Sequence, residues 1–246
     1  MSRPGKIFTK MSKKILILGA SSDIGLETVK YFLKNNWIVT AHYSSDKKKL
    51  LKIKNKNLNL FRFNLTKIKS FEKYINKNSS KISNFDAFVS LTGYMKLKNF
   101  FNISSSNLID HFNANYISNL LVIQKILNKM KKKKWGRILL ASSIGTKFGG
   151  GSLTMSYSIS KYLNEFFPSE YKKFYKHNVI INSLQIGVTD TKLHLKNKSK
   201  NMKKRIQLIP INKMASTSEV AEYIYFLCSE KNTLITNQVI NISGGE

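Results

Sequence analysis

The chain has 246 residues, of which 42 are Lys or Arg and 13 are Asp or Glu, so its formal net charge is +29. Such a charge would ordinarily suggest an anionic partner, for example nucleic acid or a membrane surface. Only four of the basic residues are arginine, however, and specific phosphate and base recognition depends on the forked guanidinium group. The excess is lysine, as an A/T-rich coding sequence would give, so we expect no specific nucleic-acid partner. Attraction of phosphorylated cofactors or acidic carrier proteins is a more modest use for the charge.

The rest of the composition excludes several other classes of protein. The single cysteine, Cys228, rules out an intrachain disulfide, and the four histidines show no ligand spacing, so we expect no metal site. No apolar run approaches the roughly 20 residues that span a bilayer, and residues 1–10 lack the apolar stretch of a secretory signal. We expect a cytoplasmic protein with a basic, disordered leader at 1–12 and a single domain at 13–246.

Short apolar runs alternate with amphipathic segments along the whole chain. The predicted strands lie at 15–18, 37–41, 58–63, 85–90, 135–141, 179–184 and 238–242. The predicted helices lie at 26–34, 67–77, 105–130, 157–175 and 217–228. This order predicts an α/β fold, a Rossmann-like doubly wound parallel sheet of about seven strands with helices on both faces. Ligands of such sheets bind at the carboxyl ends of the strands.

The first predicted strand runs into a glycine-containing turn and then a helix. Backbone N–H groups at the start of such a helix hold a pyrophosphate, and glycine lets the backbone approach it closely. The alternative is an ordinary turn between a strand and a helix. The candidate cofactor-binding residues in this turn are Gly19, Ser21, Ser22, Asp23, Ile24 and Gly25.

The end of the second predicted strand bears on the choice of cofactor. A carboxylate there would bind the ribose 2′-hydroxyl of NAD and repel the extra phosphate of NADP. This chain has Tyr43 and Ser44 instead, followed by lysines. The pattern favours NADP(H), with NAD(H) possible, because a solvated loop in a lysine-rich chain would look similar. A long polar stretch at about 188–214 is predicted to be a lid over the substrate.

A tyrosine and a lysine four residues apart, Tyr157 and Lys161, share one face of a predicted helix, and Ser143 ends the strand before it. A nearby cation stabilises a phenolate, so the pair could exchange a proton with a substrate oxygen, to which the serine could donate. The same spacing recurs at Tyr43 and Tyr94, but only Tyr157 follows a strand that ends in two serines. The alternative is a solvated helix face on which the two side chains happen to meet.

Taken together, these motifs resemble the short-chain dehydrogenase/reductase family over about 13–245. The turn at Gly19 is similar to the glycine motif of that family, Asn115 to its helix asparagine, and Ser143, Tyr157 and Lys161 to its catalytic residues. The resemblance also assigns a cofactor role to Tyr157 and Lys161. The further cofactor-binding residues that it implies are Asn64, Leu65, Gly93, Gly187, Thr189 and Thr191.

The resemblance implies a reaction in which hydride passes between NADP(H) and a carbonyl or secondary alcohol. Tyr157 would exchange the proton with the oxygen, Ser143 would orient it, and Lys161 would lower the tyrosine pKa and bind the nicotinamide ribose. Asn115 would hold a water that relays protons. A 3-oxoacyl-carrier-protein reductase and a sugar-modifying reductase fit equally well, and the alternative is a non-catalytic nucleotide-binding sensor or scaffold. The resemblance also implies a homo-oligomer, a tetramer or dimer built partly from the helices at 105–130 and 155–175.

Four positions depart from the pattern of that family. Asp23 replaces its middle glycine, so we expect the carboxylate to point away from the pyrophosphate. Ser90-Leu91-Thr92 replaces Asn-Asn-Ala, Asn64 stands in place of an aspartate, and Ile186 replaces a proline. All four lie outside the proposed catalytic residues, so they bear on cofactor affinity rather than on the chemistry.

Overall fold

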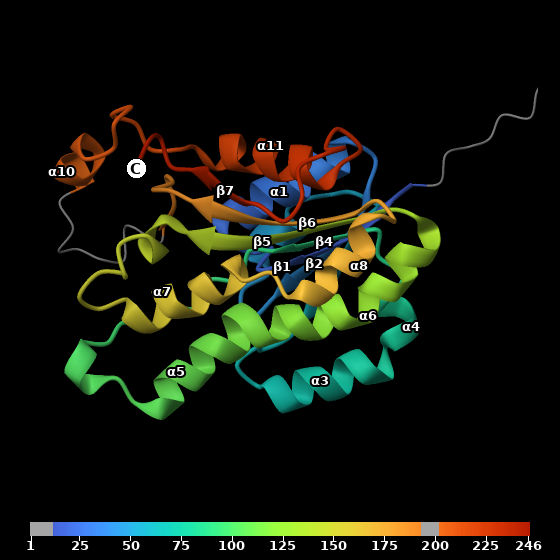
Figure 1. Ribbon diagram of the computed structural model, residues 1–246, viewed down its shortest axis with the longest axis horizontal. Coiled ribbons are helices and arrows are strands. Elements are labelled where there is room, and N and C mark those ends of the chain that lie inside the picture. The colour runs from blue at the N-terminus through green and yellow to red at the C-terminus, as the bar shows by residue number, and fades with distance from the viewer. Residues whose placement is uncertain (1–11, 193–201) are drawn as a thin grey trace, which may run out of the picture.

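In residues 12–192 and 202–246, which the computed structural model describes, seven parallel strands form one sheet in the order β3-β2-β1-β4-β5-β6-β7 (Figure 1). The strand order reverses between β1 and β4, and ligands of open α/β sheets bind outside such a point. The predicted doubly wound sheet is confirmed. Its strands are β1 (Lys14–Leu18), β2 (Ile38–Tyr43), β3 (Leu58–Arg62), β4 (Ala87–Ser90), β5 (Gly136–Ser143), β6 (Val179–Ile186) and β7 (Val239–Ile242).

Helices cover both faces of this sheet, and serine side chains cap several of them. Ser22 accepts a hydrogen bond from the Gly25 amide at the start of the first helix, and Ser216 forms a capping box with Glu219 at the start of the last. The α-helices are α1 (Asp23–Lys34), α2 (Lys48–Leu51), α3 (Ile68–Lys77), α4 (Ser79–Ile82), α5 (Ser105–Phe112), α6 (Ser118–Lys133), α7 (Met155–Tyr162), α8 (Lys172–Tyr175), α10 (Met202–Gln207) and α11 (Thr217–Cys228). Shorter helical turns are η1 (Phe100–Asn102), η2 (Asn113–Ile117), η3 (Ile144–Thr146), η4 (Leu163–Glu165) and η5 (Ser169–Tyr171).

Two apolar clusters form the core, one on each face of the sheet. Strand β1 is buried on both faces, so Ile15 and Ile17 join one cluster while Leu16 and Leu18 join the other. This burial explains why the strand is a continuous apolar run rather than an alternating one. Helices α1 and α11 cover the first cluster, and α3, α6 and α8 cover the second (Figure 1).

Two predicted helices differ from the structure. The helix predicted at 105–130 is divided by η2, a π-helical turn that contains Asn115 and separates α5 from α6. The helix predicted at 157–175 is wrong as a continuous element, because the chain is extended at Phe166 and resumes only at Ser169. Pro168 explains the break, since proline lacks an N–H and disfavours helical conformation in the residue before it.

The remaining observations concern membrane spanning, the single cysteine, metal binding and the segments predicted to be a leader and a lid. No helix within residues 12–192 and 202–246 is long and apolar enough to cross a membrane. Cys228 is completely buried, and burial raises the pKa of its thiol. In the same described ranges, no group of three or more His, Cys, Asp and Glu side chains could hold a metal ion. Apart from Ser12, the predicted leader lies outside the described residues, as does the part of the predicted lid at 193–201.

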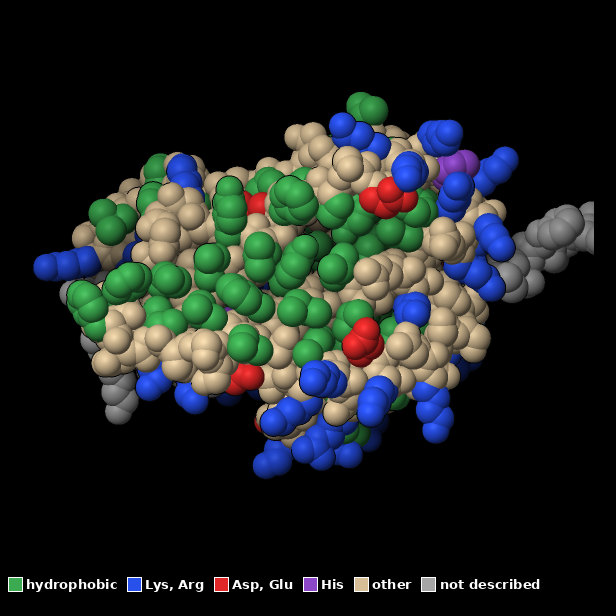
Figure 2. Space-filling model, turned by 60° about the horizontal axis from the view of Figure 1, so that its bottom comes forward, with side chains coloured by type: hydrophobic (Ala, Val, Ile, Leu, Met, Phe, Trp, Pro, Cys, Tyr) green, Lys and Arg blue, Asp and Glu red, His purple; other side chains and the backbone are tan. Residues whose placement is uncertain are grey.

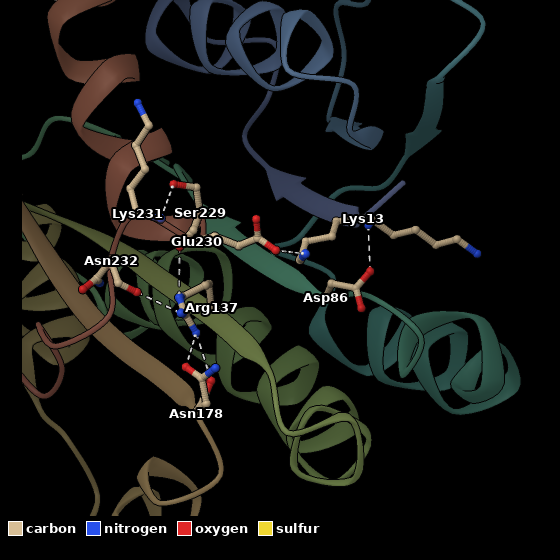
Figure 3. Close-up of polar contacts among 9 residues, drawn as sticks. Lys13, Asp86, Arg137, Asn178, Ser229, Glu230, Lys231 and Asn232 are labelled. Atoms are coloured by element: carbon tan, nitrogen blue, oxygen red, sulfur yellow. Dashed lines mark hydrogen bonds and ion pairs between the residues drawn. The ribbon is translucent and has the colours of Figure 1, made fainter. Parts of the chain in front are cut away.

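Arg137, the second residue of β5, is a buried cation at the amino ends of the strands (Figure 3). Only 2% of its surface is exposed. Its guanidinium donates to the backbone carbonyls of Asn178 at 2.9 Å, Ser229 at 3.2 Å and Asn232 at 2.8 Å. Burial lowers its pKa to about 10, so the group stays charged at neutral pH. One side chain therefore ties β5 to the turn before β6 and to the loop after α11.

Replacement of this side chain should destabilise the fold. Arg137→Met leaves the buried Ser229 and Asn232 carbonyls without this donor, so we expect the free energy of unfolding to fall by about 2–4 kcal/mol in urea denaturation. The matched control is Lys132→Met, which removes a charge from an exposed residue of α6 and should change stability by less than about 0.5 kcal/mol. Equal urea midpoints for Arg137→Met and wild type would contradict a stabilising role for Arg137.

Candidate active site

Three of the candidate catalytic residues meet at the carboxyl end of β5. Ser143 is the last residue of this strand, and α7 carries Tyr157 and Lys161 back against it. The Tyr157 hydroxyl is hydrogen-bonded to the Ser143 hydroxyl. The Lys161 ammonium donates to the carbonyl of Thr92, two residues after β4, at 2.9 Å. A phenol, a hydroxyl and an ammonium are therefore gathered at the edge of the sheet where ligands of this fold bind.

Burial shifts the pKa values of Tyr157 and Lys161 in opposite directions. It raises the pKa of the phenol to about 12, although the hydrogen bond with Ser143 works against this. It lowers the pKa of the ammonium to about 7, which the Glu165 carboxylate partly offsets. The expected lowering of the Tyr157 pKa by Lys161 is not found, because burial raises this pKa and only the hydrogen bond with Ser143 opposes the rise. At neutral pH the phenol holds its proton, while the lysine is close to half protonated.

Asn115, the fourth candidate, braces the backbone around the site. Its carboxamide accepts from the Tyr94 amide at 2.8 Å and donates to the Tyr94 carbonyl and the Ser160 hydroxyl, both at 2.9 Å. Its backbone carbonyl accepts from the side chains of Asn119 at 2.8 Å and Asn164 at 3.0 Å. The Asn115 carboxamide oxygen accepts only one of the two hydrogen bonds that it can take, so it could still bind a water, and the expected water relay stays a prediction. In this geometry Asn115 joins the loop after β4 to α7 through Tyr94 and Ser160.

Glu165 belongs to the site although the sequence analysis did not select it. One of its carboxylate oxygens accepts from the hydroxyl of Ser142, from the hydroxyl of Thr146 at 2.8 Å and from the amide of Gln185 at 3.1 Å. Ser142 also donates to the backbone carbonyl of Lys161 at 3.2 Å. The available signal was its position four residues after Lys161, which places the two side chains on one face when the segment is helical. The carboxylate places a negative charge beside Lys161, the candidate catalytic lysine.

The turn between β1 and α1 fits a dinucleotide pyrophosphate. Gly19 has a φ of 72°, and a Cβ there would lie 2.6 Å from the Leu91 carbonyl oxygen. A Cβ on Gly25 would lie 2.5 Å from the Gly19 carbonyl oxygen, so the helix can approach the turn only with glycine at this position. The first-turn amides of α1, including those of Asp23 and Ile24, have no acceptor within the helix. These amides and the positive end of the helix dipole would hold the phosphates.

His42 holds the same turn from the neighbouring strand, and the sequence analysis did not select it. Its Nδ1 accepts from the Gly19 amide at 3.2 Å, and its Nε2 lies 2.9 Å from the Phe63 carbonyl oxygen. Because a carbonyl can only accept, Nε2 carries the proton and the ring is neutral. Burial lowers the pKa of His42 to about 4, in agreement with the neutral form. The ring therefore links β1, β2 and β3 at their carboxyl ends.

The Asp23 carboxylate is engaged with two neighbouring segments. One oxygen lies 2.5 Å from the Lys49 ammonium, and the other accepts from the backbone amide of Lys192 at 2.8 Å. These partners lie on α2 and in the segment after β6. The carboxylate thus points toward α2 and the segment after β6. It nevertheless lies at the first turn of α1, next to the amides that would hold the phosphates.

At the ends of β2 and β3, several polar side chains surround the expected nucleoside position. Tyr43 ends β2, and the Arg62 side chain donates through Nε to the Ser44 carbonyl at 3.1 Å. Asn64 accepts from the amide and the hydroxyl of Thr66 at 3.1 and 2.9 Å and so braces the turn after β3. Arg62 was not predicted, although a rare arginine at a strand end in a lysine-rich chain was a usable signal.

The remaining candidates divide into those that face open space and those that pack inside. A Cβ on Gly93 would meet nothing within 4 Å, so this residue borders an open region. A Cβ on Gly187 would lie 2.5 Å from the backbone that follows β7. Leu65 is buried in the core, and Thr189 is buried with its hydroxyl donating to the Gly187 carbonyl at 3.1 Å. Leu65 and Thr189 are thus buried, Thr191 is partly exposed, and the cofactor-binding role of these residues stays a prediction.

Comparison with known proteins agrees with this geometry. Residues 19–246 match the family described as Enoyl-(Acyl carrier protein) reductase. The chain is 32% identical over 179 residues to the 3-oxoacyl-[acyl-carrier-protein] reductase FabG of Aquifex aeolicus, which covers 71% of this chain and 72% of that protein. It is 24% identical over 240 residues to the uncharacterized oxidoreductase YmfI of Bacillus subtilis, covering 96% of this chain and 99% of that protein.

Solved structures share the fold at lower identity. ElxO with NADP bound superimposes with a TM-score of 0.81 at 24% identity, covering 96% of this chain and 98% of that one. A 3-oxoacyl (acyl-carrier-protein) reductase from Agrobacterium tumefaciens with NADP bound has a TM-score of 0.82 at 19% identity, covering 95% and 94%. The family match, the relative at 32% identity and the gathered Ser143, Tyr157 and Lys161 lead to one conclusion. The chain belongs to the short-chain dehydrogenase/reductase family of NAD(P)-dependent oxidoreductases, which act on carbonyl and alcohol groups.

Proposed function

We propose that the chain reduces the 3-oxo group of an acyl thioester carried on an acyl carrier protein, with NADP(H) as cofactor. The observation that carries the proposal is the meeting of Ser143, Tyr157 and Lys161 at the carboxyl end of β5. The choice of substrate is supported by the name of the relative from Aquifex aeolicus at 32% identity. The formal charge of +29 suits an acidic carrier.

The chemistry follows from the protonation states of the side chains. When bound, the cofactor would supply a hydride to the carbonyl carbon. Tyr157 keeps its proton at neutral pH and would give it to the carbonyl oxygen, which Ser143 would hold by a hydrogen bond. A protonated Lys161 would stabilise the phenolate that remains, and Glu165 favours this protonated form. Carbonyl, hydride and proton together give the secondary alcohol.

The preference for NADP(H) over NAD(H) is supported by the residues at the ends of β2 and β3. Tyr43 and Ser44 stand where a carboxylate would select NAD. Arg62 adds a guanidinium beside Ser44, and such a group suits a ribose 2′-phosphate.

Two alternatives receive less support. A non-catalytic nucleotide-binding scaffold would have no need of a phenol, a hydroxyl and a lysine brought together at one strand end. A sugar-modifying reductase would use the same catalytic groups, but no described residue favours a sugar over an acyl chain. We keep a cytoplasmic location as part of the proposal, in agreement with a lone buried cysteine.

We also propose that the chain forms a homo-oligomer through the face that carries α5 and α7. Figure 2 shows hydrophobic side chains gathered over much of this face. Contiguous exposed apolar surface of this kind usually marks an interaction site. The exposed apolar residues from α5, α7 and the segments beside them include Ile109, Phe148, Ile159, Tyr162 and Phe166.

Tyr157→Phe tests the proposed chemistry. Without the phenolic proton, reduction of a 3-oxoacyl thioester by NADPH should slow at least about 100-fold, measured as the loss of NADPH absorbance. The variant should still bind NADPH as wild type does, and NADH more weakly, in calorimetric titrations. Retention of most of the turnover would contradict the role of Tyr157. Turnover of a keto sugar but of no thioester would favour the sugar-modifying alternative, and binding without any turnover would favour the scaffold.

Glu165→Gln tests how the lysine is tuned. Loss of the carboxylate should lower the pKa of Lys161 further below its value of about 7, since Glu165 opposes the effect of burial. If reduction needs a protonated lysine, its rate falls as pH rises through this pKa, and the fall should begin about 0.5–1 pH unit lower in the variant. The measurement is the pH profile of kcat/KM. Glu170→Gln, in an exposed ion pair with Lys173, is the control and should leave the profile unchanged. An unshifted profile for Glu165→Gln would contradict the tuning.

Ile109→Lys tests the oligomer face. This residue of α5 is 53% exposed in the isolated chain, and a lysine there would bring a charge into the apolar contact. We expect the particle mass measured by light scattering to fall at least about twofold, since the desolvation cost opposes association. The control Leu51→Lys, 48% exposed on α2, should leave the mass unchanged. An unchanged mass for Ile109→Lys would mean that another face forms the contact.

A further inference from the structure

We propose that Lys49 is a positioning residue for the cofactor, which it serves by neutralising the Asp23 carboxylate at the pyrophosphate-binding turn. The inference rests on the proposed NADP(H) dependence and concerns a part of the site that the catalytic residues do not touch. It assigns a role to a lysine outside the catalytic residues and the glycine turn. By neutralising this carboxylate, Lys49 would allow the pyrophosphate to bind next to Asp23.

Asp23 occupies the position at which a dinucleotide-binding turn has its second glycine. That glycine normally lets the backbone approach the pyrophosphate. Asp23 is also the first residue of α1, so its carboxylate uses the positive end of the same helix dipole that would attract the phosphates. The carboxylate and the pyrophosphate would therefore compete for the same positive end of α1. An uncompensated carboxylate here would repel NADPH and NADH alike, because both carry the pyrophosphate.

The carboxylate is ionised and well held. Burial would raise the pKa of Asp23, but the hydrogen bond and charge of Lys49, together with the backbone amide of Lys192, more than offset this and lower it. The Lys49 ammonium lies 2.5 Å from one oxygen, and the Lys192 amide lies 2.8 Å from the other. The side chain of Asp23 is 22% exposed and that of Lys49 is 41% exposed, so the pair borders solvent. An ion pair this exposed adds little to folding stability, which leaves binding as the process it can affect.

The position of Lys49 follows from the fold. It lies in α2, which is anchored by the completely buried Leu50. Lys47 and Lys48 are exposed, whereas Lys49 is partly buried against Asp23. Asp23 and Lys49 both line an open cavity of about 530 Å³ beside α1. One lysine of the run is therefore directed at the carboxylate, and its neighbour Lys48 is a matched control.

The test is a double-mutant cycle measured by calorimetric titration with NADPH and, separately, with NADH. Lys49→Met should weaken the binding of both nucleotides about tenfold, within the range measured for coupled neighbours. Asp23→Asn removes the charge but keeps an oxygen for the Lys192 amide, so it should bind both at least as tightly as wild type. In the Asp23→Asn background, Lys49→Met should change either affinity by less than about twofold. Lys49→Arg, which keeps the charge, and the control Lys48→Met should both bind like wild type.

The other outcomes overturn the inference in distinguishable ways. Lys49→Met could instead weaken the binding of NADPH alone, both in the wild-type chain and in the Asp23→Asn background. The lysine would then contact the 2′-phosphate directly. If Lys49→Met changed neither affinity, or if Asp23→Asn weakened the binding of both nucleotides, the proposed neutralisation of Asp23 by Lys49 would be wrong. Circular dichroism melts check that each variant is folded, and an exposed pair should shift them little. Absence of nucleotide binding by the folded wild type would overturn the proposed function and the inference together, whereas binding without coupling would overturn the inference alone.

Discussion

The hydrogen bond from the Lys161 ammonium to the Thr92 carbonyl is the contact on which the site depends. It joins α7 to the backbone after β4, one of the two strands between which the strand order reverses. A lysine that is only 2% exposed must have compensating partners, since desolvation of a cation costs several kcal/mol. Thr92 supplies one partner, and the Glu165 carboxylate supplies a favourable charge. The same burial that makes these partners necessary brings the lysine pKa close to neutrality.

The groups around Lys161 form two braces of different character. On one side, Asn115 binds both backbone groups of Tyr94 and so fixes the loop that follows Thr92. On the other side, Glu165 accepts hydrogen bonds from the hydroxyl of Ser142, from a side chain of β6 and from a side chain in the turn after β5. Neither brace touches the proposed reacting oxygen. Together they hold the phenol, the hydroxyl and the ammonium with little freedom, which is how a preorganised site lowers a barrier.

The departures from the family pattern are accompanied by local partners. Ser90 and Thr92, in the segment that replaces Asn-Asn-Ala, have their hydroxyls 3.0 Å apart and so bond to each other. Asp23, in place of a glycine, is paired with Lys49 and the Lys192 amide. Asn64, in place of an aspartate, accepts two bonds from Thr66 and stabilises its own turn. Each substitution thus changes the local network instead of leaving a polar group unsatisfied.

The sequence by itself determined the fold class, and it predicted the glycine turn and the candidate residues Ser143, Tyr157 and Lys161. These are local patterns, because apolar runs, turn residues and helical spacing are carried by neighbours in the chain. The helix predicted at 157–175 fails for a reason that is also local, because Pro168 interrupts it. Only the tertiary structure decided that Glu165, His42 and Arg62 belong to the site, and that burial raises the pKa of Tyr157 while it lowers that of Lys161. The physical reason is that desolvation and pairing depend on residues far apart in sequence, such as Lys161 with Thr92 or Asp23 with Lys192.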